Sequence, residues 1–251
     1  MYRIFMNEKY ISVLTDRYVS EMHSHELLQM FMTCKQKLSL KINEETVEGN
    51  CIVIDGNTSH HLTKNDPVDF LMFIEPTCSA AIQFRRYFSG KHYIAYQKKQ
   101  LQNQLECFQR DPTQETYETF LQGLFFALHI DFHRQVTCDS RIVQLTQMME
   151  SYRTFDYSVE SISSRLALSP SRLAHLFNEQ TGMPLKSYLV MHRLMYAYSL
   201  LFQGKNITEA AIQSGFYSSS HLAMLNKKLT GVTASSILKN SEFLKASFFN
   251  L

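Results

Sequence analysis

The sequence predicts an α+β protein with a β-rich N-terminal region followed by a region made only of helices. Short β-branched and aromatic runs separated by polar turns fill about the first 95 residues, and apolar residues at helical spacing replace them from about residue 97. A chain of 251 residues is long enough for two modest domains. We therefore expect a β domain at 1–95, a helical linking or dimerising segment at 96–139, and a helical domain at 140–251.

Strand patterns in the first domain are short and bounded by turns that contain Asn, Asp and Gly. No helical pattern lies between them, so they predict a small barrel or sandwich. The expected strands are Tyr10–Leu14, Leu27–Thr33, Lys37–Ile42, Cys51–Ile54 and Val68–Ile74.

Two amphipathic helices are expected next. Leu101, Leu105 and Phe108 recur at helical spacing up to the stop at Asp111-Pro112, and a second helix opens at Thr113. Its apolar stripe consists of Tyr117, Phe120, Leu121, Leu124 and Leu128. The stripe must be buried, either against the β domain or against a second subunit. We favour the β domain and keep dimerisation as the alternative.

From Ser140 onward the pattern contains helices and no strand. Ser169-Pro170 reads as an N-cap followed by Pro at the first helical position, and the next helix runs from Pro184 to about Leu201. The remaining boundary signals are caps at Ser158, Thr208 and Ser218 and stops at Gly182, Gly204, Gly215 and Gly231.

A short helix, a tight turn and a second helix occur twice in this region. In the first copy, Val159, Ile162 and Leu166 precede a turn at Leu168-Ser169, and Leu173, Leu176 and Phe177 then face inward. In the second copy, Ile207, Ala210, Ala211 and Ile212 precede a turn at Gly215-Phe216, and Leu222 and Leu225 then face inward. This unit places its second helix in the major groove of DNA.

The helical region strongly resembles the AraC family of bacterial transcription regulators over about 100 residues, with the spacing kept throughout. The residues that carry the resemblance are Leu166-Ala167-Leu168-Ser169, Leu173, Leu176-Phe177, Gly182, Tyr188, Arg193-Leu194, Ala197, Leu200-Leu201, Ile207-Thr208-Glu209-Ala210-Ala211, Gly215-Phe216, Ser218, Ser220, Lys227-Lys228 and Gly231. The resemblance implies seven C-terminal helices, one recognition helix in each half, and a variable N-terminal domain that senses a ligand or dimerises.

The candidate DNA-binding residues are those that the periodicity leaves on the outward faces of the two recognition helices. They are Ser171, Arg172, His175 and Asn178 in the first helix, and Ser219, Ser220, Ala223, Met224, Lys227 and Lys228 in the second. Arg172 could bind guanine through two hydrogen bonds or bind a phosphate. Each residue could instead simply be solvated, but the first face as a group favours DNA.

The second half departs from the family pattern. Relatives usually carry Arg at the position of Met224 and Phe at the position of Asn226, and their closing Pro-x-x-Tyr-Arg element is replaced by Ala234-Ser235-Ser236-Ile237-Leu238. Loss of an arginine removes a charge-assisted contact. We therefore expect one strong reader of DNA and one weak reader.

The N-terminal domain resembles the cupin-like barrel common in this family, because His23, His25 and His60 stand at cupin metal-ligand positions while Gln29 replaces the usual Glu. Three imidazoles could hold a divalent metal. The alternative, which we favour from sequence, is a remnant without metal, as in most sensing domains of the family. An apolar interior that includes Met30, Phe31 and Phe70 could enclose a small effector, although core packing explains the same residues.

Composition and charge agree with this interpretation. Residues 140–251 hold 11 Lys and Arg against six Asp and Glu, whereas residues 1–139 hold 14 against 17, so the helical region is the basic one. Five scattered cysteines without a CxxC pair favour reduced thiols. The start of the chain has no secretion signal and no apolar run suits a membrane span, so we expect a cytoplasmic protein.

The expected function is sequence-specific binding of double-stranded DNA by a transcription regulator, more readily an activator that contacts RNA polymerase than a repressor. A small effector, or homodimerisation through the N-terminal part, would control it. We expect no enzymatic activity and no cofactor, because no catalytic constellation is visible. The alternatives are a metal-dependent cupin enzyme or sensor with an appended helical module, and a regulator that works through protein contacts.

Overall fold

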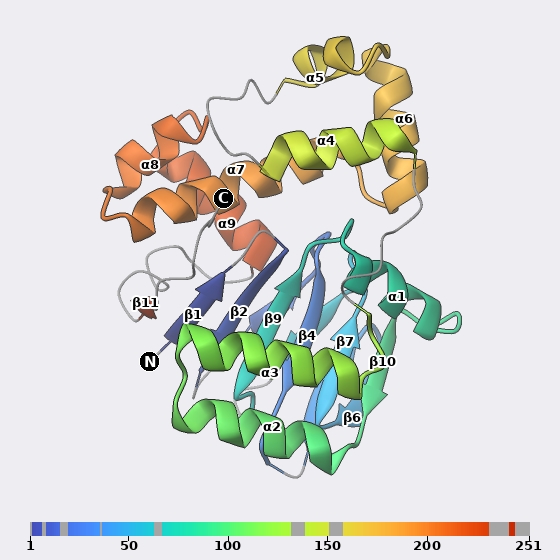
Figure 1. The fold of residues 1–251 in the computed structure, drawn as a ribbon, viewed down its shortest axis with the longest axis vertical. Coiled ribbons are helices and arrows are strands. Elements are labelled where there is room, and N and C mark those ends of the chain that lie inside the picture. The colour runs from blue at the N-terminus through green and yellow to red at the C-terminus, as the bar shows by residue number, and fades with distance from the viewer. Residues whose placement is uncertain are drawn as a thin grey trace. The chain divides into compact units, whose positions relative to one another are not determined.

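The computed structural model describes residues 2–6, 9–15, 20–35, 37–62, 67–131, 139–150, 158–230 and 241–243. It is an α+β structure whose strands lie mainly in the N-terminal half and whose later helices follow one another in the C-terminal half (Figure 1). The chain forms two compact units, Met1–Arg134 with Ala223–Leu251, and Gln135–Leu222. No helix in the described ranges has the length and apolar character that crossing a membrane requires.

The larger sheet has seven strands in the order β10-β7-β4-β9-β2-β1-β11. They are β1 (Tyr2–Met6), β2 (Tyr10–Leu14), β4 (Leu28–Met32), β7 (Cys51–Ile54), β9 (Phe70–Ile74), β10 (Tyr93–Tyr96) and β11 (Ser241–Phe243). Their pairings are antiparallel except for β1 with β11, which are parallel. The expectation of no strand after Ser140 is therefore wrong. The three residues of β11 are ordered by a partner more than 200 residues away, which local periodicity cannot reveal.

The smaller sheet has four strands in the order β3-β8-β5-β6, namely β3 (Ser20–His23), β5 (Leu38–Ile42), β6 (Glu45–Gly49) and β8 (His60–Leu62). Each of the five predicted strands is present, with ends that differ by no more than two residues. The strands that the sequence patterns did not predict are β1, β3, β6, β8, β10 and β11. All of them are five residues long or shorter, as are the five predicted strands, so length alone does not explain why they were missed.

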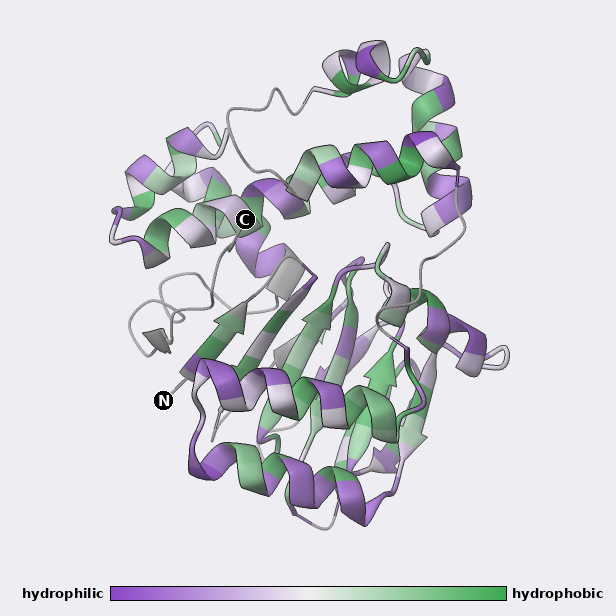
Figure 2. Cartoon of the chain, viewed as in Figure 1, coloured by the Kyte–Doolittle hydropathy of each residue, from purple (hydrophilic) through white to green (hydrophobic). Residues whose placement is uncertain are grey.

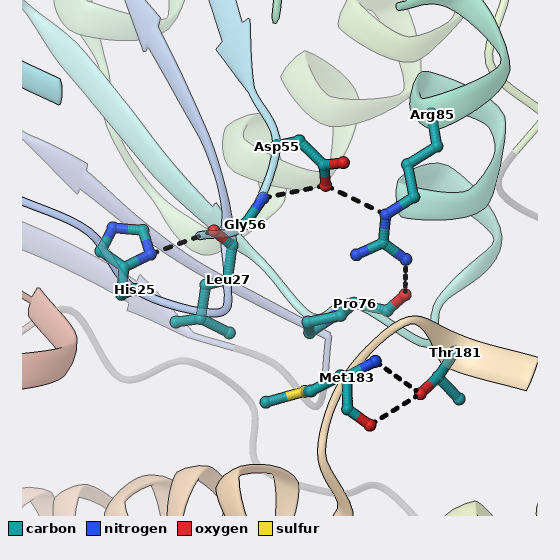
Figure 3. Close-up of polar contacts among 8 residues, drawn as sticks. All are labelled: His25, Leu27, Asp55, Gly56, Pro76, Arg85, Thr181 and Met183. Atoms are coloured by element: carbon teal, nitrogen blue, oxygen red, sulfur yellow. Dashed lines mark hydrogen bonds and ion pairs between the residues drawn. The ribbon is translucent and has the colours of Figure 1, made fainter. Parts of the chain in front are cut away.

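A helix interrupts the strand-rich region at α1 (Ser79–Tyr87), where only strands were expected. Ala80, Ala81 and Phe84 of α1 are buried, so the hydrophobic core stabilises a helix of only nine residues. Arg85 of α1 donates to Asp55 Oδ1 at 3.0 Å and to the Pro76 carbonyl at 3.1 Å, which ties the helix to the ends of β7 and β9 (Figure 3).

The helices α2 (Lys99–Arg110) and α3 (Gln114–Ala127) lie side by side over one face of the larger sheet (Figure 1). Their apolar stripes belong to the same buried core as the sheet, and the rings of Phe108 and Phe120 stack with centroids 4.8 Å apart. Figure 2 shows the alternation of hydrophobic and hydrophilic residues along both helices. The prediction that this stripe packs against the β domain is confirmed, so a dimer contact through α2 and α3 has to use their outer faces.

The central strands β4 and β9 are buried on both faces, which explains their nearly continuous apolar sequences. Met30 and Met72 pair across the two strands and belong to the core shared with α2 and α3. Successive residues of a strand point to opposite faces, so Gln29, Phe31 and Phe73 face away from those helices.

The C-terminal helices are α4 (Ser140–Glu150), α5 (Val159–Arg165), α6 (Pro170–Thr181), α7 (Leu185–Phe202), α8 (Ile207–Gln213) and α9 (Ser219–Thr230). The predicted caps at Ser158 and Ser169 are confirmed by hydrogen bonds to backbone N–H groups. The predicted cap at Thr208 is wrong, because Asn206 caps α8. The predicted stop at Gly231 and the closing element at 234–238 lie outside the described residues.

Phe108→Ala tests the contribution of α2 to the core. Phe108 is 2% exposed and contacts the rings of Phe5 and Phe120, so truncation should lower the free energy of unfolding by about 3–5 kcal/mol. Phe126→Ala is the matched control: the side chain is 79% exposed, and the change should be within about 0.5 kcal/mol. Urea unfolding followed by fluorescence and circular dichroism measures both. Equal effects of the two substitutions would show that α2 does not pack as described.

Candidate nucleic-acid interface

The first helix pair, residues 158–182, consists of α5, a four-residue turn and α6. Ser169 Oγ accepts a hydrogen bond from the N–H of Arg172 at 3.2 Å, and Pro170 occupies the first position of α6, where a missing N–H costs nothing. Within the turn, the N–H of Leu168 donates to the Ser163 carbonyl at 2.9 Å. Gly182 ends α6 in the left-handed region at φ 71°, a conformation that glycine adopts without strain.

Helix α6 has one buried apolar side and one exposed polar side. Leu173, Leu176 and Phe177 are buried as predicted, with exposed fractions of 0–4%. The predicted DNA-binding residues of this helix, namely Ser171, Arg172, His175 and Asn178, are all exposed. Because they recur at helical spacing, they form one polar face that carries a guanidinium, an imidazole and a carboxamide. These groups can donate to base edges and to phosphates.

The second helix pair, residues 206–230, consists of α8, a turn and α9. Asn206 Oδ1 accepts from the N–H groups of Thr208 and Glu209, and Glu209 accepts in return from the N–H of Asn206. Gly215 in the turn has a φ of 80°, and the following Phe216 is 4% exposed. The N–H of His221 donates to Ser218 Oγ at 3.1 Å, as the predicted cap at Ser218 requires.

The outward face of α9 differs from that of α6. Ser220, Met224, Lys227 and Lys228 are exposed, whereas Ser219 and Ala223 are half-buried. Met224 is 62% exposed, so the centre of the face is apolar. Leu222 is buried as predicted, but Leu225 is only half-buried, and Asn226 is fully buried at the position where relatives carry Phe.

One exposed aromatic residue was not predicted as a site residue. Tyr217 is 90% exposed and stacks on the ring of His221, with centroids 5.4 Å apart and planes inclined by 20°. The signal in the sequence is the pair Phe216-Tyr217 between Gly215 and the cap at Ser218. Only one of two adjacent aromatic residues can enter the core of such a tight turn, so the other is left outside.

Helix α7 joins the two pairs. The ring of Tyr188 lies 4.8 Å from that of Phe177 in α6 and 4.4 Å from that of His192 in α7. His192 is buried, and burial lowers its pKa to about 3, so it stays neutral at physiological pH. Most of α7 is buried, which makes it a firm connection between α6 and α8.

The predicted effector or metal residues also come together. Ligand atoms of His23, His25 and His60 all lie within 4.8 Å of one another. Gln29 Oε1 lies 2.9 Å from Nε2 of both His25 and His60. Burial lowers the pKa of His25 to about 4 and that of His60 to about 3, so both rings are neutral at physiological pH.

A protein-family model described as a helix-turn-helix domain matches residues 162–240, which include α6, α7 and α8. This match and the buried apolar side of α6 support a DNA-binding transcription regulator with a helix-turn-helix domain of the AraC type. No curated protein matches the sequence significantly.

Solved structures with the same fold include ToxT from Vibrio cholerae. ToxT from strain O395 is 18% identical, with a TM-score of 0.55 over 89% of this chain and 93% of that chain. Wild-type ToxT from strain SCE256 with a bound unsaturated fatty acid is 16% identical, with a TM-score of 0.54 over 92% and 95% of the two chains. At this identity the likeness concerns the fold, and it extends over nearly the whole of both chains.

Asn206→Ala should destabilise α8, because two backbone N–H groups lose their acceptor. The expected cost is about 1 kcal/mol. It should appear as faster amide hydrogen exchange in α8. Thr208→Ala is the control, since Thr208 is exposed and contributes only its backbone N–H to the cap. Faster exchange in Thr208→Ala than in Asn206→Ala would place the start of the helix at Thr208 after all.

Proposed function

We propose that the chain binds double-stranded DNA in a sequence-specific manner through two helix-turn-helix motifs, with α6 as the strong reader and α9 as the weak reader. The observation that carries the proposal is the exposed polar face of α6 opposite its buried leucines and Phe177. A helix anchored along one side and capped at Ser169 presents the other side at a fixed rotation, as readout of base edges requires.

Arg172 is the principal reading residue in this proposal. A guanidinium forms two parallel hydrogen bonds with O6 and N7 of guanine, and such a pair discriminates against the wrong base by about 1–3 kcal/mol. His175 and Asn178 lie on the same face at positions i+3 and i+6 from Arg172 and are competent for adjacent bases or for phosphates.

Helix α9 contributes affinity more than specificity. Met224 offers an apolar contact, which suits the methyl group of thymine, and it cannot form the charge-assisted hydrogen bonds of an arginine. Lys227 and Lys228 are exposed and suit phosphates. Tyr217, exposed at the start of α9, adds a hydroxyl within the same turn.

Helix α7 sets the spacing of the two motifs. Eighteen residues rise about 27 Å, which is of the same order as the roughly 34 Å that separates successive major-groove segments on one side of DNA. A single chain can therefore address two consecutive segments.

The N-terminal part (1–95) is proposed as a cupin-like sensing domain, 96–139 as the linking segment, and 140–251 as the DNA-binding domain.

ToxT structures carry an unsaturated fatty acid in one case and a naphthalenyl butenoic acid in another. This favours an apolar carboxylate as the class of effector here. Binding of the effector, or homodimerisation through the outer faces of α2 and α3, would change how the two motifs bind DNA. In this proposal the DNA-bound protein contacts RNA polymerase and activates transcription in the cytoplasm.

Arg172→Ala should reduce specific DNA binding more than Met224→Ala does. Loss of a two-hydrogen-bond contact predicts a decrease of about 10- to 100-fold in affinity for the selected operator. Loss of the exposed Met224 side chain predicts only a few-fold decrease. Gel-shift titrations at one fixed salt concentration, on an operator selected from random DNA, measure both.

Arg86→Ala serves as the charge-matched control, since Arg86 is exposed on α1 and belongs to neither helix pair. It should leave operator affinity unchanged within about twofold. Equal losses from Arg172→Ala and Met224→Ala would contradict the unequal roles of the two helices. A loss in Arg86→Ala as large as that in Arg172→Ala would mean that bulk charge, not a reading face, drives binding.

A further inference from the structure

The start of α9 carries a tyrosine and a histidine whose rings are stacked. Tyr217 precedes the cap residue Ser218, and its side chain is 90% exposed. Its ring lies on that of His221, four residues later, with centroids 5.4 Å apart and planes inclined by 20°. Among the described residues, the Tyr217 hydroxyl forms no hydrogen bond. This polar group is therefore available to a partner outside the chain.

Three further contacts hold the two rings in place. Phe216 is 4% exposed, and its ring meets that of His221 edge-on, with centroids 5.5 Å apart and planes inclined by 82°. The N–H of Tyr217 donates to His221 Nδ1 at 3.4 Å, and the N–H of His221 donates to Ser218 Oγ at 3.1 Å. The imidazole thus contacts one buried and one exposed ring and is tied to the backbone. Tyr217 is therefore ordered before any partner binds, which lowers the entropic cost of binding.

Tyr217 is in line with the outward face of α9. Ser220, Met224 and Lys227 follow it at positions i+3, i+7 and i+10, and all of them are exposed. The stripe has a tyrosine at one end, an apolar centre and a lysine at the other end. Ten residues at helical rise span about 15 Å, which is comparable with the roughly 12 Å width of the major groove. Groups at the two ends of the stripe can therefore reach the phosphates on either side of the groove.

We propose that Tyr217 binds a phosphate of the DNA backbone through its hydroxyl and that His221 is the residue that positions it. Helix α9 contains no arginine, and the centre of its outward face is Met224. A hydroxyl donates a strong hydrogen bond to an anionic phosphate oxygen. This contact at the start of α9, with the lysines near its end, holds the helix in a fixed register on DNA. The inference rests on the proposed function and deepens it, because it names the group that anchors the second motif.

A base is a less suitable partner for Tyr217 than a phosphate. His221 covers one face of the ring, and the bases of a duplex present their edges in the grooves rather than their faces. Stacking on a base therefore suits single strands. Phosphate and sugar oxygens accept about half to two-thirds of the hydrogen bonds between proteins and DNA, and tyrosine is among their donors.

The experiment uses the full-length chain and an operator selected from random DNA. Tyr217→Phe keeps the ring and removes the hydroxyl, so affinity should fall about five- to tenfold. The fall should be equal on operators with base substitutions in the second segment, because a phosphate contact carries no sequence information. The salt dependence of binding should not change, since a neutral hydroxyl releases no counterions, whereas Lys227→Ala should lower the slope by about one.

Ile212→Ala is the matched control. Ile212 is 57% exposed on α8 of the same helix pair and has no group that can donate to a phosphate. Its truncation should leave affinity unchanged within about twofold. A loss in Ile212→Ala as large as that in Tyr217→Phe would overturn the proposal, because any change to the exposed surface of this motif would then have the same effect.

Methylphosphonate replacements, made one at a time in the second segment of the operator, locate the phosphate. One replacement should weaken binding of the parent chain by the same factor as Tyr217→Phe and have no further effect on Tyr217→Phe. If the parent chain binds the operator and no replacement is coupled to Tyr217 in this way, the inference fails and the proposed function stands. If the parent chain selects no operator, the proposed function fails as well.

His221→Ala tests the positioning role. It should lower affinity as much as Tyr217→Phe does, and the double variant should bind no more weakly than either single variant, because the two residues act as a unit. His221→Phe, which keeps a ring against Tyr217, should bind within about twofold of the parent chain. Additive losses, or equal losses in His221→Phe and His221→Ala, would overturn the role of His221. Tyr217→Phe remains decisive for the phosphate contact if His221→Ala fails to fold.

Discussion

Phe177 of α6 contacts Tyr188 of α7 with ring centroids 4.8 Å apart, and both side chains are buried almost completely. This contact, with Leu173 and Leu176 beside it, sets the rotation of α6 about its own axis. Because Leu173, Leu176 and Phe177 are buried on one side of α6, the residues on the opposite side of the helix face outward. The candidate reading face is therefore a consequence of packing. A change in the contact between Phe177 and Tyr188 would rotate α6 about its axis, and the side chain of Arg172 would then face a different direction.

The same reasoning explains why the two helix pairs are unequal. Among the described side chains of α9, the buried ones are Leu222 and the polar Asn226, Leu225 is only half-buried, and the outward centre is Met224. An exposed Met224 cannot form the charge-assisted hydrogen bonds that a guanidinium forms, so the outward side of α9 offers fewer polar groups than that of α6. The two lysines near its end retain attraction for phosphates, which carries little sequence information.

Much of the C-terminal region could be predicted from sequence, because its signals are local. Ser169-Pro170, Gly182 and Gly215 mark boundaries through backbone chemistry that involves only near neighbours. The error at Thr208 is of the same kind, since Asn206, two residues earlier, offers a better acceptor. The N-terminal region was harder to predict. β11 depends on β1, and α1 depends on burial of Phe84, so neither has a local signature. His23, His25 and His60 were singled out by type and spacing, but their convergence on Gln29 depends on two sheets that local patterns do not place.

The central claim is that two helix pairs in one chain contact DNA with unequal strength. A hydroxyl-radical footprint of the full-length chain on a selected operator tests it most directly. The account predicts two protected segments about one helical turn apart, with the segment lost in Arg172→Ala being the more strongly protected. A single protected segment, or two segments protected equally and weakened equally by Arg172→Ala and Met224→Ala, would contradict it.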